Sequence, residues 1–188
     1  LVSYSVQFPE FTVFDFMTGR WSSSHHESLP RNQQHSRWFD PDTRMLYVFG
    51  GYGNHLYNSD FYSRNIDTRE WHYTDLAESI APRYLAAMGM SDGNLLVMGG
   101  YGNRSGRQEE SPRNMYDINM IDMLTCEVTH VSDFSMPDDR YSMASTLVCD
   151  VKSGKIYTLA FDNGHSASSL NLISVAKGSS EAVFCGNP

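Results

Sequence analysis

The sequence has few cysteines, no long apolar run and fewer basic than acidic residues. Its three cysteines, Cys126, Cys149 and Cys185, are an odd number without C-x-x-C spacing, so they predict neither a disulfide framework nor a zinc site. No run of about eighteen apolar residues occurs, so we expect no membrane span in this segment. Lys and Arg total 14 against 22 for Asp and Glu. The formal charge of −8 argues against a nucleic-acid binder, which needs a basic surface.

Motifs of metal binding and catalysis are also missing. The seven histidines show no H-E-x-x-H spacing, and no G-x-S-x-G occurs. Gly99-Gly100-Tyr101-Gly102 is rich in glycine, but we expect no helix after it, so it lacks the helix dipole of a phosphate-binding loop. We therefore expect no metal and no cofactor, and we favour a protein that is not an enzyme.

No stretch carries a sustained helical period, and the chain shows a repeated strand signal instead. The apolar run Met45–Phe49 is followed by Gly50-Gly51-Tyr52-Gly53-Asn54. The pattern recurs as Asn94–Met98 followed by Gly99-Gly100-Tyr101-Gly102-Asn103. Each apolar run predicts a buried strand, because it is short and ends at a turn signal. The glycine pair allows positive φ where the strand is expected to end.

Two tryptophans and three arginines keep the same register. Trp21 and Trp71 each follow an aspartate-containing turn, Arg31 and Arg83 each follow a proline, and Arg140 follows an aspartate as a weaker third copy. The order is arginine, then apolar residues with the glycine pair, then aspartate, then tryptophan. This order, with about 50 residues between copies, resembles the kelch repeat of the galactose oxidase-like superfamily.

The resemblance implies an all-β fold made of four-stranded antiparallel β-propeller blades. We divide the single segment 1–188 into blade parts 1–30, 31–77, 78–134 and 135–188, and we expect only two strands in the first part. Propellers close with about four to eight blades, and about three and a half blades leave sheet edges open. We therefore expect self-association or a longer chain that completes the propeller.

The same resemblance places ligands at loops on one end of the propeller. Those loops offer aromatic, amide and guanidinium groups that suit a protein, peptide or carbohydrate ligand. The candidates are Tyr52, Asn54, His55, Tyr101, Asn103, Arg104 and Arg107. The alternative is that the tyrosine and asparagine after each glycine pair only shape the turn, since asparagine tolerates left-handed geometry.

The remaining repeat residues are expected to be structural. The arginines Arg31, Arg83 and Arg140 are expected to form a repeated ion pair, and the two tryptophans are expected to pack within blades. The loop residues, and not these structural residues, indicate the function.

The favoured function is a non-catalytic recognition module. The alternatives are an extracytoplasmic sensor or input domain of a larger signalling receptor, and a galactose-oxidase-like or sugar-modifying enzyme. No tyrosine and histidine set matching the copper site of galactose oxidase is recognisable.

Overall fold

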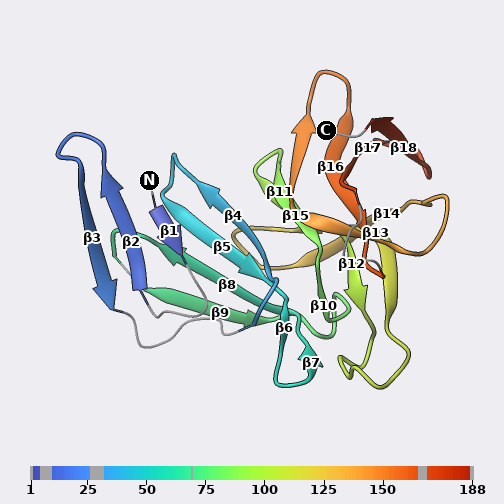
Figure 1. Ribbon diagram of the computed structural model, residues 1–188, viewed down its shortest axis with the longest axis horizontal. Helices are drawn as coiled ribbons and strands as arrows, with labels where there is room; N and C mark the ends of the chain where they lie inside the picture. Colours follow the sequence, from blue (N-terminus) through green and yellow to red (C-terminus); the bar gives the residue numbers. More distant parts are fainter. Residues whose placement is uncertain (1, 5–9, 26–31, 69, 165–168, 187–188) are drawn as a thin grey trace.

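The computed structural model describes residues 2–4, 10–25, 32–68, 70–164 and 169–186, and within them it contains strands and turns but no helix (Figure 1). The expected all-β fold of antiparallel, blade-like sheets is confirmed. The strands are β1 (Val2–Tyr4), β2 (Glu10–Asp15), β3 (Arg20–His25), β4 (Ser36–Asp40), β5 (Met45–Phe49), β6 (Tyr52–Gly53), β7 (Leu56–Tyr57), β8 (Asp60–Asn65), β9 (Trp71–Asp75), β10 (Arg83–Tyr84), β11 (Ala87–Ser91), β12 (Asn94–Gly102), β13 (Arg113–Ile121), β14 (Val128–Asp133), β15 (Tyr141–Asp150), β16 (Lys155–Asp162), β17 (Asn171–Ala176) and β18 (Ala182–Gly186).

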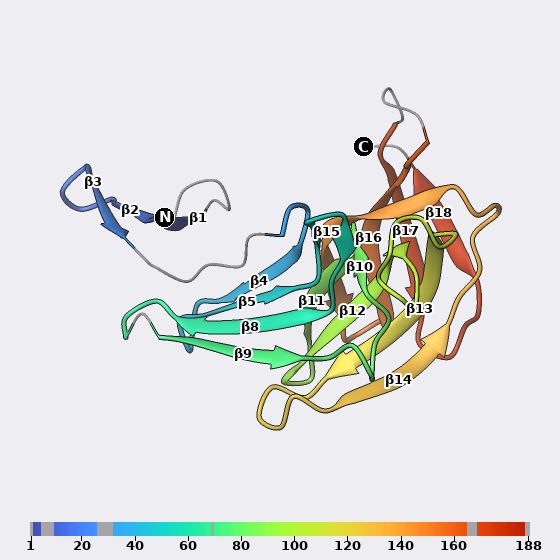
Figure 2. The same ribbon diagram turned by 90° about the horizontal axis from the view of Figure 1, so that it is seen from below.

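The strands form three four-stranded units and a smaller N-terminal sheet. The first blade has the order β4-β5-β8-β9, the second β11-β12-β13-β14 and the third β15-β16-β17-β18. The short hairpin β6–β7 lies between β5 and β8 in sequence, and β10 adds to the end of β12. Figure 2 shows the three blades as one curved body, with the N-terminal sheet β1-β2-β3 standing apart from it.

Hydrogen bonds join the blades at or just before their first strands, which lie side by side. The amide of Leu85 donates to the carbonyl of Gln34 at 3.3 Å, and the amide of Met143 donates to the carbonyl of Leu85 at 3.1 Å. One further parallel pair, Met88 with Thr146, connects β11 to β15. These links run from blade to blade, so they fix the angle between neighbouring sheets.

Alternation along the second strand of each blade builds the core between blades. In β5, Tyr47 and Phe49 face the second blade, whereas Leu46 and Val48 face the other side of their sheet, because successive side chains of a strand point to opposite faces. The core between the first and second blades comprises Tyr47, Phe49, Phe61, Leu76, Ile80, Ala86, Met88, Leu95, Val97 and Ile121. The core between the second and third blades comprises Ala87, Leu96, Met98, Ile118, Phe134, Met143, Leu147, Ala160, Ile173 and Val175.

The glycine pairs have the same geometry in both copies, but only one of them ends a strand. Gly50 and Gly51 have φ of 69° and 101°, and Gly99 and Gly100 have φ of 66° and 119°. A Cβ on Gly50 would lie 2.6 Å from the carbonyl oxygen of Arg83, so glycine is needed for this approach. The prediction that both pairs end their strands is wrong for the second copy. There β12 continues to Gly102, because a register shift between Met98 and Gly100 absorbs the irregularity.

The N-terminal sheet differs from the sequence-based expectation in two ways. It contains a third strand, since β1 pairs antiparallel with β2. Trp21 does not pack inside a blade. Its side chain is 57% exposed and contacts Phe14, because no other described sheet packs against this one. Trp71, by contrast, lies half-buried against Leu46 and Val48.

Five hairpin turns share a side-chain cap on the end of the molecule opposite the glycine pairs. Each begins with an aspartate or asparagine whose side chain accepts the backbone N–H two residues further on. The capping residues are Asp15, Asp40, Asn65, Asp122 and Asp150. In all five, the third residue after the cap also donates to it through a hydroxyl or its amide, as Ser153 does to Asp150 at 2.6 Å. Such Asx turns set the chain reversal locally.

These caps predict a loss of stability in acid. The pKa values of Asp15, Asp40, Asp122 and Asp150 are lowered, chiefly by hydrogen bonds from the threonine or serine three residues further on. A lowered pKa in the folded state contributes stability above the unfolded-state pKa, and this contribution is lost as the pH falls through the folded-state value. The free energy of unfolding should therefore fall below about pH 4.

The test replaces these four aspartates by asparagine and compares urea midpoints at neutral and acidic pH. Asparagine keeps the acceptor oxygen, as Asn65 shows in the fifth turn, but it does not titrate. The variant should lose less stability in acid than the wild type. Equal losses in the two proteins would contradict the role assigned to the caps.

Candidate functional site

Four tyrosines from two blades gather at the end of the sheets where the glycine pairs lie. Tyr52 pairs with Tyr57 across β6 and β7, and Tyr84 pairs with Tyr101 across β10 and β12. The rings of Tyr57 and Tyr84 stack, with centroids 5.6 Å apart and an interplanar angle of 12°. The ring of Tyr52 lies 6.0 Å from that of Tyr84, and the ring of Tyr101 lies 6.0 Å from that of Tyr57. We call these four residues the tyrosine cluster.

Backbone hydrogen bonds between the two blades position the cluster. The amide of Gly51, next to Tyr52, donates to the carbonyl of Arg83 at 2.8 Å, and the amide of Arg83 donates to the carbonyl of Asn58 at 3.0 Å. Tyr84 directly follows Arg83, so these bonds fix the two cross-strand tyrosine pairs relative to each other.

The polar loop between β12 and β13 reaches across to the first blade and holds the other side of the cluster. The amide of Tyr57 donates to the carbonyl of Gly106 at 2.7 Å, and the hydroxyl of Tyr52 donates to Oε1 of Gln108 at 2.5 Å. Arg104 donates to the carbonyl of Glu78 at 2.6 Å. An insertion in one blade thus orders the surface of its neighbour.

The environment keeps the buried part of the cluster neutral. Burial, together with the neighbouring tyrosines Tyr101, Tyr84 and Tyr52, raises the pKa of Tyr57 to about 12. Burial also raises the pKa of Tyr84, against the opposing effect of a hydrogen bond with Asn163. At neutral pH these hydroxyls stay protonated, so they act as hydrogen-bond donors beside aromatic faces.

An ion pair between the buried Arg83 and the half-buried Asp117 lies next to the cluster. Arg83 donates to both carboxylate oxygens of Asp117 and, at 3.0 Å, to the carbonyl of Gly99. Burial acts to raise the pKa of Asp117, but hydrogen bonds and charge from Arg83, with a hydrogen bond from Asn119, outweigh it and lower that pKa. Arg83, the first residue of β10, is therefore fixed to β13 of its own blade through Asp117.

The arrangement of glycine pairs, buried arginine and blade-like sheets agrees with a comparison against protein families. The family model for the KLHDC2/KLHL20/DRC7 Kelch-repeats domain matches residues 3–181. The chain belongs to the Kelch-repeat family. Kelch-repeat domains are typically protein-binding modules. No curated protein matches the chain.

Within this Kelch-repeat domain, the position of Arg83 has a different counterpart from the one the sequence indicated. Arg31 was expected to be its equivalent in the first blade, but that residue lies outside the described residues. The neighbouring Asn32 occupies the equivalent place. Its Nδ2 donates to the carbonyl of Gly50 and to Asp60, as Arg83 donates to Gly99 and Asp117. The first and second blades therefore share the contacts to the glycine carbonyl and the aspartate, but asparagine makes them in the first blade and arginine in the second.

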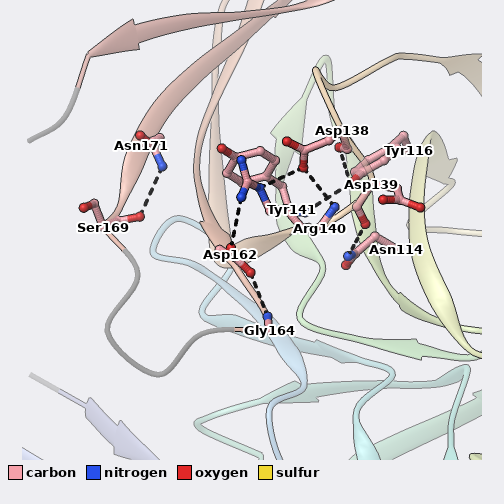
Figure 3. A network of polar contacts seen from close by, with 10 residues as sticks. All are labelled: Asn114, Tyr116, Asp138, Asp139, Arg140, Tyr141, Asp162, Gly164, Ser169 and Asn171. Carbon is pink, nitrogen blue, oxygen red and sulfur yellow. Dashed lines mark hydrogen bonds and ion pairs between the residues drawn. The ribbon is translucent and has the colours of Figure 1, made fainter.

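The third blade has its own polar network beside the cluster. Figure 3 shows Arg140 between Asp138 and Asp162, with ion-pair distances of 3.0 and 3.7 Å. The guanidinium of Arg140 also lies 5.5 Å from the centroid of the Tyr141 ring. The hydroxyl of Tyr116 accepts the amide of Tyr141. Arg140 is therefore paired with acidic residues, although its partners differ from that of Arg83.

The residues predicted from the sequence have different places at this end. Tyr52 and Tyr101 belong to the tyrosine cluster. His55 is exposed, with its Nδ1 3.5 Å from Nε2 of Gln108. Asn54 is exposed and has φ of 53°, the left-handed geometry of a turn residue.

The other three predicted residues belong to the inserted loop of the second blade. Asn103 donates through its side chain to the carbonyls of Arg107 and Glu110, so its amide shapes the loop. Arg104 ties the loop to the carbonyl of Glu78. Arg107 is exposed and lies 3.6 Å from Glu110 in an ion pair.

Two cluster members, Tyr57 and Tyr84, were missed by the sequence analysis. The dipeptide Arg83-Tyr84 recurs as Arg140-Tyr141, and this repeat could have identified Tyr84. Nothing in the local sequence distinguishes Tyr57, because it reaches the cluster through the β6–β7 hairpin.

Two other features are absent from the described part of the chain. Among its residues, no three His, Cys, Asp or Glu side chains come together in a way that could hold a metal ion. The same residues include no helix long and apolar enough to cross a membrane.

Proposed function

We propose that this Kelch-repeat domain is a non-catalytic module that binds a protein or peptide segment at the tyrosine cluster. The observation that carries the proposal is the convergence of four tyrosines from two blades at one end of the sheets. Tyrosine is enriched at binding hot spots, because its ring supplies a large contact area and its hydroxyl supplies a hydrogen bond at low conformational cost.

The surroundings of the cluster suit the rim of such an interface. His55, Arg107 and Gln108 lie exposed beside Tyr52 and Tyr57, and binding interfaces combine a desolvated aromatic centre with a polar rim. The loop contacts to Tyr52 and Tyr57 hold the rings in place before a ligand arrives. Pre-organised side chains lose less conformational freedom on binding, which favours affinity.

The test selects ligands from a displayed library of random linear peptides. Selected peptides are titrated against the wild type and against Tyr101→Ala, and affinity should fall about tenfold or more in the variant, the loss expected of a hot-spot aromatic residue. Tyr73→Ala is the matched control. Tyr73 is 57% exposed on β9, an edge strand where its ring contacts Tyr62, so its removal should leave the affinity unchanged.

Thermal unfolding of both variants confirms that they are folded at the assay temperature. Failure to select any peptide that binds the wild type above background would count against the proposal. Equal losses from Tyr101→Ala and Tyr73→Ala would also count against it. Binding in a glycan array, without peptide binding, would assign the same surface to a carbohydrate ligand.

A further inference from the structure

We infer that the peptide segment recognised at the tyrosine cluster is cationic, with an arginine or lysine side chain lying over the tyrosine rings. This inference rests on the proposed function and specifies the chemistry of the partner. It follows from three features of this end of the molecule: the aromatic faces, the exposed carboxylates on residues linked to the cluster, and the existing partners of the arginines.

The aromatic faces are the first feature. Three of the four tyrosines are only half-buried, so parts of their rings reach the surface. The face of an aromatic ring carries negative electrostatic potential and attracts ammonium and guanidinium groups. Among the described residues, the cation–π contacts involve Trp71 and Tyr141 and none of these four rings, so the cluster offers several positions for one cation.

Carboxylates without partners are the second feature. Glu78, Glu109 and Asp139 are exposed, and their side chains make no hydrogen bond or ion pair within the described segments. Glu109 follows Gln108, the acceptor of the Tyr52 hydroxyl. The backbone carbonyl of Asp139 accepts from Asn114, the register partner of Tyr101.

The arginines of this end are the third feature, because most of them are already engaged. Arg83 is held by Asp117, Arg107 by Glu110, and Arg140 by Asp138. Arg104 donates to the carbonyl of Glu78. Arg113 is exposed and makes no ion pair with described residues. A carbonyl does not neutralise Arg104, so among the described residues the three carboxylates without partners stand against the two guanidinium groups of Arg104 and Arg113. This balance is negative, in keeping with the formal charge of −8, and a cationic segment complements it.

The third blade contains an internal example of the proposed contact. The guanidinium of Arg140 lies over the ring of Tyr141 and between the carboxylates of Asp138 and Asp162 (Figure 3). Here one tyrosine ring and two carboxylates of the domain contact the guanidinium of Arg140. Tyr101 and Asp139 offer the same kinds of group to an arginine from outside.

The experiment uses the peptide library already described and examines the composition of what it selects. We expect enrichment of arginine and lysine, and affinity that falls as salt is raised, because exposed charges are screened. In a selected peptide, replacing one arginine by norleucine should weaken binding about two- to fivefold, the range for an exposed cation–π contact.

Charge changes in the domain should act in both directions. Asp139→Asn and Glu109→Gln should weaken binding of a selected peptide, and Arg113→Glu should strengthen it. Glu127→Gln is the matched control. Glu127 is an exposed carboxylate at the β13–β14 turn, on the opposite end of the blade, so its change should leave binding unaltered.

The outcomes separate this inference from the proposed function. Selected peptides that are neutral or acidic, or whose affinity is independent of salt, would overturn the inference and leave peptide binding intact. Equal effects of Asp139→Asn and Glu127→Gln would overturn it as well. If no peptide bound at all, the proposed function and the inference would both fail.

Discussion

Arg83→Ala is expected to lower the free energy of unfolding by about 3–5 kcal/mol, the range found when one partner of a buried ion pair is removed. The Arg83 side chain is 1% exposed and donates to Asp117 and to the carbonyls of Ala81 and Gly99. Its removal leaves the half-buried carboxylate of Asp117, 22% exposed, without its counter-charge, and it removes the guanidinium donor from two carbonyls. Urea unfolding at neutral pH measures the loss.

The pH dependence of the Arg83→Ala variant identifies the cause. In the wild type the pKa of Asp117 is lowered, because Arg83 outweighs the effect of burial. Without Arg83, only the hydrogen bonds from Asn119 and the backbone oppose burial, so the pKa of Asp117 rises relative to the wild type. A higher pKa in the folded state means that ionising Asp117 contributes less stability to the variant at neutral pH than to the wild type. The deficit of the variant relative to the wild type should therefore shrink on acidification.

Asn32→Ala is the matched control for Arg83→Ala. Asn32 makes the equivalent contacts to Gly50 and Asp60 in the first blade, but it is uncharged. Its loss should cost about 1 kcal/mol, the usual net worth of a hydrogen bond. Equal costs for the two variants, or a deficit for Arg83→Ala that does not depend on pH, would show that the buried charge is not what matters.

Phe49→Ala should also destabilise the domain by about 3–5 kcal/mol, as truncation of a buried phenylalanine does elsewhere. Phe49 is 1% exposed and lies in the core between the first and second blades, with Leu76, Ile80 and Met88. Removing its ring leaves a cavity where two sheets meet, and the backbone bonds between the blades limit how far the sheets can close it. Denaturant unfolding reports the loss.

Trp21→Ala is the comparison that shows whether burial sets the cost. Trp21 is a larger aromatic residue but is 57% exposed, so its truncation should stay near the ±0.5 kcal/mol range of ordinary surface substitutions. A larger loss from Trp21→Ala than from Phe49→Ala would contradict the placement of the core.

The sequence alone determined the strands with the strongest local signals. The predicted strand Met45–Phe49 is β5 with the same bounds. The signals are local, because a short apolar run between turns has few alternatives to a buried strand. The period of about 50 residues likewise led to the Kelch-repeat family.

The sequence did not determine which residue of the first blade is equivalent to Arg83, because this equivalence depends on tertiary contacts. The Pro-Arg dipeptides aligned Arg31 with Arg83, yet Asn32 is the residue that reaches the glycine carbonyl and the aspartate of the first blade. Local similarity and structural equivalence differ by one residue here. The deciding factor is which side chain meets Gly50 and Asp60 across the sheet.

The candidate site shows the same division between sequence and tertiary structure. Sequence determined that Tyr52 and Tyr101 follow the glycine pairs, since that pattern is local. Only the tertiary structure brought Tyr57 and Tyr84 to them, through cross-strand pairing and backbone bonds between two blades. Side-chain direction within a strand follows from a two-residue period, but which blades meet is set by contacts between residues far apart in the chain, and no short sequence pattern specifies these.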